Sequence, residues 1–325
     1  MRVFLTGATG FVGRNVLQWL LENVPDARIE CLVRSWEKAA LLPEDPRVKI
    51  IYGDLLKPET YKRDLVDEEI VIHTAALVSL RNGPEFYEAN VEATRNLLNI
   101  SAQRKALKRF VFVGSISSYE HSPEEKNISE PLTENAVPFP STDYGKSKLQ
   151  AQHMVATSGL PYSVMIPSYI YGPYPRLKSS MDRIIYDVRD GKPYTKIPLP
   201  GCATQIYAPD LAEAIWLGAT HPQCQNQTFF VGNHTPVKVG DAYAAIAQGL
   251  GMAYKPRDVS PEAIARLKKL VYQKRPNEAF VKVLFENYFW ASSEKLSRLT
   301  GWQPRHTLAE GVEKTLLWYR QNGLL

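Results

Sequence analysis

A tyrosine and a lysine four residues apart are the side chains of this chain best suited to proton transfer. Tyr144 and Lys148 stand in the run Tyr-Gly-Lys-Ser-Lys, and on a helix that spacing places both on one face. A free tyrosine has a pKa of about 10, so it exchanges protons poorly at neutral pH. An ammonium about 4 Å away would stabilise the phenolate by about 4 kcal/mol at an effective dielectric constant of about 20, enough to lower that pKa by about three units. The pair therefore predicts a general acid–base, whereas a solvent-facing Tyr and Lys is the simpler interpretation of so short a pattern.

Ser115 is a third candidate for the same chemistry. It directly follows the apolar run 110–114, which predicts a strand. At the carboxyl end of that strand its hydroxyl would hold a substrate oxygen beside the tyrosine. A serine-rich turn is the alternative.

A glycine-rich segment at 6–13, Thr-Gly-Ala-Thr-Gly-Phe-Val-Gly, predicts a phosphate-binding turn. It lies between the apolar run 3–5 and a helical pattern. In such a unit the backbone approaches a pyrophosphate and directs N–H groups at it. Gly7 would make the tight turn, Gly10 would leave room for the phosphates, and Gly13 would let helix and strand pack closely. An ordinary glycine-containing turn is the alternative.

The elements that must position these residues alternate in type along the first half of the chain. Short apolar runs followed by turn signals predict strands, and patterns with helical spacing separate them. This alternation predicts an α/β fold with a doubly wound parallel sheet, whose ligands bind at the carboxyl ends of the strands. The predicted strands are 3–5, 28–33, 48–52, 70–74, 110–114 and 162–166, and the predicted helices are 11–23, 58–66, 85–104 and 143–157.

The second half predicts a smaller α+β lobe that binds the substrate. Pro, Tyr and Lys become frequent between 173 and 202, and a strand at 205–208 and a helix at 210–220 then return to the sheet. We therefore predict a dinucleotide-binding Rossmann domain formed by 1–174 with 203–222, and a substrate-binding lobe formed by 175–202 with 223–325. The elements predicted in the lobe are a strand at 228–231, helices at 239–250 and 308–321, and a long basic amphipathic stretch at 261–282.

Composition excludes several classes of protein. The 325 residues, 44% of them hydrophobic, suffice for a large core, and a formal net charge of +5 without a basic block does not indicate nucleic-acid binding. No apolar run reaches the length of about 18 residues that a membrane helix needs, and the predicted first strand leaves no room for a signal peptide. The three cysteines lie far apart without metal-ligand spacing, so we expect neither disulfides nor a metal site and predict a cytoplasmic protein.

Together these residues resemble the extended branch of the short-chain dehydrogenase/reductase superfamily, which includes nucleotide-sugar epimerases and dehydratases. Within that branch, the chain looks most like the dihydroflavonol-reductase and 3β-hydroxysteroid-dehydrogenase-like members. The resemblance covers nearly the whole chain. It is carried by the glycine-rich 6–13, Gly-Asp-Leu at 53–55, His-Thr-Ala-Ala at 73–76, the Asn-Val run at 90–98, Ser115, Tyr-Gly-Lys-Ser-Lys at 144–148, Pro-Ser-Tyr-Ile-Tyr-Gly-Pro at 167–173 and the ending 301–323.

The resemblance implies a role for each matching position. Tyr144 would be the acid–base, Lys148 would bind the nicotinamide ribose and lower the tyrosine pKa, and Ser115 would orient the reacting oxygen. The other implied dinucleotide contacts are Gly7, Thr9, Gly10, Phe11 and Val12 at the pyrophosphate, Asp54 and Leu55 at the adenine, Ala75 and Ala76 along the ribose, and Pro167 and Ile170 at the nicotinamide.

The end of the second predicted strand bears on the form of the cofactor. An acid there would accept a hydrogen bond from the ribose 2′-hydroxyl of NAD. Here Arg34 follows the strand and Lys38 comes one helical turn later, whereas Glu30 lies four residues too early. Because two cations suit a 2′-phosphate, we predict NADP as the preferred cofactor, with NAD as the alternative.

Departures from the family pattern narrow the reaction. Dehydratases of this branch carry Asp-Glu directly after the strand-end hydroxyl, where this chain has Ile116 and Ser117. Many nucleotide-sugar enzymes carry Arg-Asp where this chain has Ala203 and Thr204, so one expected partner of a diphosphate is missing. We therefore predict an oxidoreductase that transfers a hydride between a nicotinamide cofactor and a carbonyl/alcohol substrate. The alternatives are a nucleotide-sugar 4-epimerase with tightly bound NAD and a non-catalytic dinucleotide-sensing regulator.

The sequence says least about the substrate side and the assembly. The stretch 261–282 would form a lid over a less polar substrate, or simply a surface helix packed on the lobe. The family also implies a homodimer that pairs through helices 85–104 and 143–157 across a two-fold axis. The predicted substrate contacts are Val78, Ser117, Tyr169 and Met181.

Overall fold

The computed structural model describes residues 1–65, 68–78, 83–120, 130–175, 180–274, 279–286 and 289–325. Seven strands, all parallel, form a central sheet in the order β10-β6-β5-β4-β1-β2-β3. The chain starts in the middle, winds outward to β3, and returns to build the other half. The predicted doubly wound Rossmann fold is therefore confirmed. The strands are β1 (Arg2–Thr6), β2 (Arg28–Val33), β3 (Val48–Tyr52), β4 (Ile70–His73), β5 (Arg109–Val113), β6 (Tyr162–Pro167) and β10 (Gln227–Val231).

Helices cover both faces of this sheet, which explains why its central strands are almost wholly apolar. On one face, α1 (Phe11–Asn23) packs beside α6 (Ala208–Thr220). On the other face lie α3 (Ala93–Ser101), which continues a π-helical turn at Tyr87–Glu92, and α4 (Asp143–Ala156). A single turn, α2 (Trp36–Ala39), follows β2.

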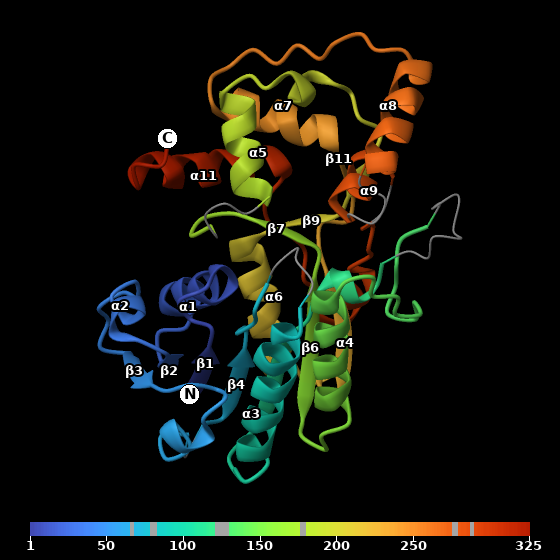
Figure 1. Ribbon diagram of the computed structural model, residues 1–325. Coiled ribbons are helices and arrows are strands. Elements are labelled where there is room, and N and C mark those ends of the chain that lie inside the picture. Colours follow the sequence, from blue (N-terminus) through green and yellow to red (C-terminus); the bar gives the residue numbers. More distant parts are fainter. Residues whose placement is uncertain (66–67, 79–82, 121–129, 176–179, 275–278, 287–288) are drawn as a thin grey trace.

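Above the carboxyl edge of the sheet lies a second group of helices, shown in the upper half of Figure 1. Three of them, α5, α7 and α11, share an apolar cluster around Tyr171, Tyr243 and Tyr319. Two small sheets, β7 with β9 and β8 with β11, lie at the junction. The elements are β7 (Tyr169–Tyr171), α5 (Ser180–Arg189), β8 (Cys202–Ala203), β9 (Gln205–Tyr207), β11 (Val237–Lys238), α7 (Val239–Gly249), α8 (Pro261–Lys274), α9 (Ala279–Phe285) and α11 (Leu308–Gln321). Helix α10 (Glu294–Thr300) instead packs beside β10 of the central sheet.

Two expectations about these elements are wrong. The strand at 228–231 belongs to the central sheet and not to the lobe, because its buried side chains pair and pack beside β6. Within 58–65, the described part of the predicted helix 58–66, the structure has a 3-10 turn at Pro58–Thr60 and no α-helix, and the buried Tyr61 and Leu65 account for the apolar pattern. Of the predicted amphipathic stretch 261–282, the described residues are helical, in α8 and in the first part of α9, and residues 275–278 lie outside the described part of the chain.

As the last strand added, β10 leaves one edge of the sheet open, and side chains from elsewhere cover it. Glu134 accepts a hydrogen bond from the Phe230 N–H at 2.9 Å, and Lys295 donates to the Thr228 carbonyl at 2.9 Å. These two side chains satisfy backbone groups that would otherwise be open to pairing with another strand.

The described residues show no helix long enough and apolar enough to cross a membrane. Within the same residues, no three His, Cys, Asp or Glu side chains are grouped so that they could hold a metal ion. The three cysteines are buried as free thiols.

Candidate active site

The carboxyl edge of the sheet gathers most of the residues that the sequence singled out. Because the strands are parallel, the segments that follow them all leave at this edge. The segments are the glycine turn after β1, Arg34 after β2, Asp54 and Leu55 after β3, Ala75 and Ala76 after β4, Ser115 after β5, and Pro167 with Ile170 at the end of β6.

The glycine turn has the geometry that a close approach requires. Gly7 has φ +75°, a conformation that favours glycine, and its carbonyl accepts the Gly10 N–H at 2.8 Å. A Cβ on Gly13 would lie 2.1 Å from the Gly7 carbonyl oxygen, so only glycine fits where α1 crosses β1. The first turn of α1 has neither a side-chain cap nor an acidic residue. Its N-terminal N–H groups and dipole therefore suit an anion such as a pyrophosphate.

The two cations predicted to select the cofactor both lie in solvent. Strand β2 ends at Val33 as expected, so Arg34 is the first residue beyond it, and both Arg34 and Lys38 are exposed. Glu30 lies within the strand and pairs with Lys49 at 3.2 Å, away from the strand end.

Helix α4 carries the tyrosine and lysine, and its first turn is packed against the loop after β5. Thr142 caps the helix by accepting the Gly145 N–H at 3.0 Å. A Cβ on Gly145 would lie 2.2 Å from the Ser117 carbonyl oxygen, and Ser118 donates to the Gly145 carbonyl at 3.1 Å. The glycine of the Tyr-Gly-Lys-Ser-Lys run thus lets the serine loop approach the start of α4.

Lys148 is 2% exposed, and its Nζ lies 4.1 Å from the centre of the Phe112 ring on β5. Burial lowers the pKa of Lys148 to about 7. Tyr144, one turn earlier, is half-buried with its ring edge-to-face against Phe86. The Ser115 hydroxyl oxygen accepts the Ser117 N–H at 3.2 Å, which fixes its rotamer and leaves its proton for another acceptor.

A buried histidine connects the glycine-turn strand to the helices. His73 Nδ1 lies 2.6 Å from the Thr6 hydroxyl, and its Nε2 lies 2.9 Å from the Thr94 hydroxyl. Thr94 donates its own proton to the Asn90 carbonyl at 2.6 Å, so it accepts from Nε2–H, and Nδ1 accepts from Thr6. Burial, and secondarily the Lys148 charge, lowers the pKa of His73 to about 3, so the ring stays neutral.

Asn90 extends this connection to α4. Its side chain exchanges two hydrogen bonds with the Leu77 backbone, at 2.7 and 3.1 Å, and donates to the Ser147 hydroxyl at 2.9 Å. Ser147 in turn donates to the Tyr144 carbonyl at 2.8 Å. The segment after β4 and the helix that bears Tyr144 are thereby held in one network.

The predicted substrate contacts are less closely grouped. Val78 is 41% exposed beyond the Ala75–Ala76 segment, and Ser117 lies in the loop after β5. The Tyr169 ring packs edge-to-face on Phe289. The Met181 side chain lies outside the described part of the chain.

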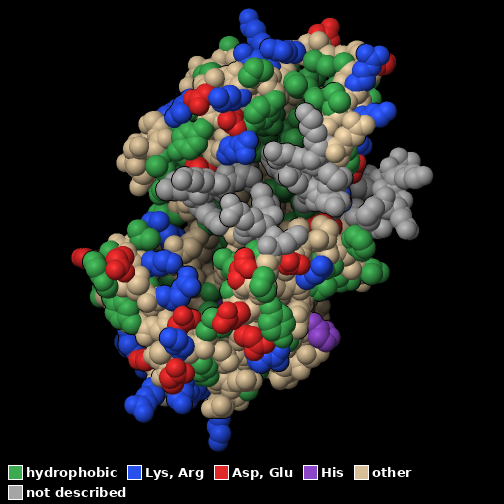
Figure 2. Space-filling view, viewed as in Figure 1, with side chains coloured by type: hydrophobic (Ala, Val, Ile, Leu, Met, Phe, Trp, Pro, Cys, Tyr) green, Lys and Arg blue, Asp and Glu red, His purple; other side chains and the backbone are tan. Residues whose placement is uncertain are grey.

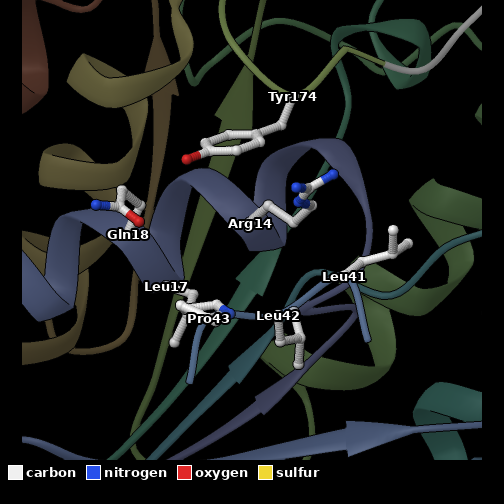
Figure 3. A pocket seen from close by; sticks show the side chains of 7 residues that line it. All are labelled: Arg14, Leu17, Gln18, Leu41, Leu42, Pro43 and Tyr174. Atoms are coloured by element: carbon white, nitrogen blue, oxygen red, sulfur yellow. The ribbon is translucent and has the colours of Figure 1, made fainter. Parts of the chain in front are cut away.

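A cavity of about 210 Å³ lies on the outer side of α1, away from α4. Figure 3 shows Arg14 and Tyr174 on one side of it and the turn at Leu41–Pro43 on the other. The Arg14 guanidinium lies 4.3 Å from the centre of the Tyr174 ring, which ties α1 to the chain beyond β7. On the face in Figure 2, charged side chains of both signs are interspersed.

Sequence reasoning did not assign a role to His73, Asn90 or Phe112. The first two lie inside motifs that carried the family resemblance, and their polar types within apolar surroundings were the available signal. Phe112 gave no signal, because an aromatic residue in a buried strand is ordinary.

Comparison with known proteins gives a consistent result. A family model described as the NAD-dependent epimerase/dehydratase family matches residues 3–232. The chain is 25% identical to the dTDP-glucose 4,6-dehydratase of Salmonella typhimurium, over 99% of this chain and 93% of the relative.

Two solved structures illustrate the likeness in fold. The UDP-glucuronic acid 4-epimerase of Bacillus cereus, in complex with UDP-glucuronic acid and NAD, has a TM-score of 0.78 at 20% identity and covers 99% of this chain and 100% of its own. DesIV, a dTDP-glucose 4,6-dehydratase from Streptomyces venezuelae with NAD bound, has a TM-score of 0.78 at 21% identity and covers 99% and 98%. At these identities the structures show the shared fold.

Proposed function

Because this chain belongs to the NAD-dependent epimerase/dehydratase family, we propose that it transfers a hydride between a nicotinamide dinucleotide and a carbonyl/alcohol substrate, with Tyr144 as the acid–base. The resemblance to the extended short-chain dehydrogenases is confirmed at the level of this family. The narrower resemblance to dihydroflavonol reductases and 3β-hydroxysteroid dehydrogenases stays a prediction. The observation that carries the proposal is the burial of Lys148, 2% exposed, one helical turn from Tyr144.

The residues of the carboxyl edge fit a dinucleotide. The uncapped start of α1 suits the pyrophosphate, and the absence of a side chain at Gly13 lets α1 lie directly against the glycine turn. When bound, the nicotinamide supplies or accepts the hydride.

Proton transfer is the part played by the chain itself. In reduction the Tyr144 hydroxyl gives its proton to the substrate oxygen, and in oxidation it takes the proton back. The Ser115 hydroxyl donates a hydrogen bond to the same oxygen, since its own oxygen is already engaged with the Ser117 N–H. The Lys148 ammonium stabilises the phenolate and so brings Tyr144 nearer to the pKa that the reaction needs.

We propose NADP as the preferred form of the cofactor, although the family is named for NAD and both solved neighbours hold NAD. The support is the charge at the end of β2, where Arg34 and Lys38 are exposed and Glu30 is engaged with Lys49. A 2′-phosphate there would gain two cations and meet no carboxylate from the strand end.

Dehydration is disfavoured despite the dehydratases among the relatives. The two residues that follow Ser115 are Ile116, which packs in the core, and Ser117. Neither can act as the acid or the base of water elimination at neutral pH.

A nucleotide-sugar 4-epimerase is the second candidate, because family relatives act on nucleotide sugars. Against it stand Ala203 and Thr204, which are 4% and 0% exposed at the position where many such enzymes carry an arginine. The Thr204 hydroxyl is engaged with the Ala291 backbone in both directions, at 3.0 and 3.1 Å. That segment therefore supplies packing and no cation for a diphosphate.

Purification separates the two candidates. The protein would be isolated without added cofactor, denatured, and assayed for released dinucleotide. An oxidoreductase of the proposed kind releases little and binds added NADPH, whereas stoichiometric NAD would favour the epimerase. Panels of carbonyl compounds and UDP-sugars then identify the substrate class.

The Tyr144→Phe variant tests the acid–base. We expect turnover to fall by about 10²–10⁴-fold while dinucleotide affinity, measured by fluorescence titration, stays nearly unchanged. A regulator that only senses dinucleotide would show no dependence on this hydroxyl in any functional assay.

Two further predictions belong to this proposal. Val78, Ser117, Tyr169 and Met181 are proposed substrate contacts, to be tested by substitution once a substrate is known. The homodimer would form through α3, α4 and the turn Tyr87–Glu92, which lie together on one face of the sheet. Light scattering of the purified protein measures that assembly directly.

A further inference from the structure

The ammonium of Lys148 is held against an aromatic ring rather than a carboxylate. Its Nζ lies 4.1 Å from the centre of the Phe112 ring, and Phe112 is fully buried on β5. No carboxylate of the described residues lies within ion-pair distance of Lys148. At this separation the negative face of the ring attracts a cation, and the attraction is strongest where water is excluded.

The other groups around Lys148 do not replace this contact. The charge of Lys148 acts on His73 of β4, and Tyr144 precedes Lys148 by one turn of the same helix. His73 is a neutral imidazole whose two nitrogens are both engaged with threonine hydroxyls, and its ring lies 5.8 Å from the Phe112 ring. The Lys148 ammonium therefore lies beside two uncharged rings, His73 and Phe112, and the face of the Phe112 ring is the group that attracts it.

We propose that Phe112 is a positioning residue, whose ring fixes the Lys148 ammonium and stabilises its charged form in the buried site. The proposal rests on the proposed function, in which that ammonium supports the Tyr144 phenolate. Burial alone favours the neutral amine. The ring opposes this effect, so that a larger fraction of Lys148 stays protonated near neutrality.

Phe110 provides a matched control on the same strand. Phe110 and Phe112 are two residues apart, both fully buried, and both belong to the same apolar cluster. Both rings also lie near His73, at 6.2 and 5.8 Å between centroids. Phe112 differs in that Lys148 lies over its face.

Fluorinated phenylalanines test the ring directly. Stepwise fluorination removes the negative potential of the ring face with little change in volume. The full-length protein would carry one, two or three ring fluorines at position 112, and the ε-carbon of Lys148 would be followed by NMR through a pH titration. The signal is assigned by its absence in Lys148→Gln. We expect the pKa of Lys148 to fall stepwise, by about one unit in total. The same series at position 110 should leave it unchanged.

Activity gives the second readout. Because the protonated ammonium is the active form, activity is lost as pH rises through the pKa of Lys148. Phe112→Leu should therefore move this basic limb of the kcat profile to lower pH by about one unit, whereas Phe110→Leu should lower stability to a similar degree without moving the limb. A purely structural ring would reduce kcat equally at every pH.

The possible outcomes distinguish a failure of this inference from a failure of the proposed function. An unchanged pKa of Lys148 across the fluorinated series at position 112 overturns the inference, while Tyr144→Phe still judges the function. A stepwise fall in that pKa with an unmoved kcat limb supports the ring contact and shows that the charge of Lys148 is not needed for turnover, which contradicts the proposed function. A fall in the pKa together with a shifted limb supports both.

Discussion

Asp210 at the start of α6 and His306 just before α11 are joined by a 2.7 Å contact between Oδ1 and Nδ1. The second carboxylate oxygen accepts the backbone N–H groups of Arg305 and His306, at 3.1 and 3.0 Å. Asp210 is 2% exposed. One buried carboxylate thus fastens the segment before α11 to the start of α6 through three contacts.

We expect Asp210→Asn to lower the free energy of unfolding by about 1–3 kcal/mol, because an amide nitrogen would face groups that are themselves donors. Denaturant unfolding measures the change. The control is Glu213→Gln, which breaks only the ion pair with the exposed Arg305 and should cost well under about 1 kcal/mol. If Asp210→Asn and Glu213→Gln lowered the free energy of unfolding equally, the Asp210 carboxylate would not be what holds the segment before α11 in place.

Lys148→Met should make the protein more stable and inactive. The pKa of Lys148 in the folded protein is about 7, below its ordinary 10.5, so the unfolded chain binds more protons between these values. The free energy of unfolding of the wild type therefore rises with pH across that window. The variant lacks this dependence, and its advantage should be about 2–4 kcal/mol at or below neutral pH and vanish towards pH ~10.5.

Denaturant unfolding at a series of pH values checks this window. Lys146→Met on the same helix is the control, since Lys146 is exposed and pairs with Asp143 at 3.5 Å. Its stability should differ little from that of the wild type at any pH. A Lys148→Met variant that is less stable throughout would mean that the native state gains from the buried charge.

Gly13→Ala should abolish dinucleotide binding and destabilise the fold. The new Cβ would lie 2.1 Å from the Gly7 carbonyl oxygen and 2.8 Å from the Thr74 hydroxyl, so α1 must move away from the turn. We expect a loss of about 2 kcal/mol or more in unfolding free energy. Gly240→Ala in α7, where a Cβ meets nothing within 4 Å, should be neutral or slightly stabilising. Calorimetric titration with NADPH would contradict the prediction if both variants bound equally well.

Arg34→Asp should turn cofactor preference towards NADH. The aspartate would repel a 2′-phosphate and accept a hydrogen bond from a 2′-hydroxyl. The ratio of NADPH to NADH affinity should fall by about tenfold or more, a change of about 1.4 kcal/mol. Arg28→Asp, at the opposite end of β2, serves as a charge-matched control with an unchanged ratio. If the ratio of NADPH to NADH affinity did not change in Arg34→Asp, the 2′-phosphate of the cofactor would have to bind away from Arg34.

Local signals explain which parts of the fold the sequence could predict. Helix α11 begins at Leu308 and ends at Gln321, as expected, because Thr307 and Glu310 form a capping box beside a clear apolar stripe. The glycine turn could also be predicted, because the need for glycine at Gly7 and Gly13 arises from close contacts within the strand–turn–helix unit. Strand β10 was misassigned because its place beside β6 depends on a contact between distant segments, and periodicity says nothing about partners.

In the candidate site, too, local features could be predicted and contacts between distant segments could not. The positions of Tyr144, Lys148 and Ser115 follow from their elements, so spacing and strand ends were sufficient. The contact between Lys148 and Phe112 joins a helix to a strand in another layer, and no linear pattern contains it.

The place of β10 has a consequence for synthesis of the protein. Strands β1 to β6 and the helix bearing Tyr144 leave the ribosome before residues 227–231 do. Until β10 is synthesised, β6 is therefore an unpaired edge strand of the nascent sheet. Lys295, which caps β10, emerges later still. The growing chain is thus open to pairing with neighbouring chains on a polysome when the elements that carry Tyr144 and Lys148 have already been synthesised.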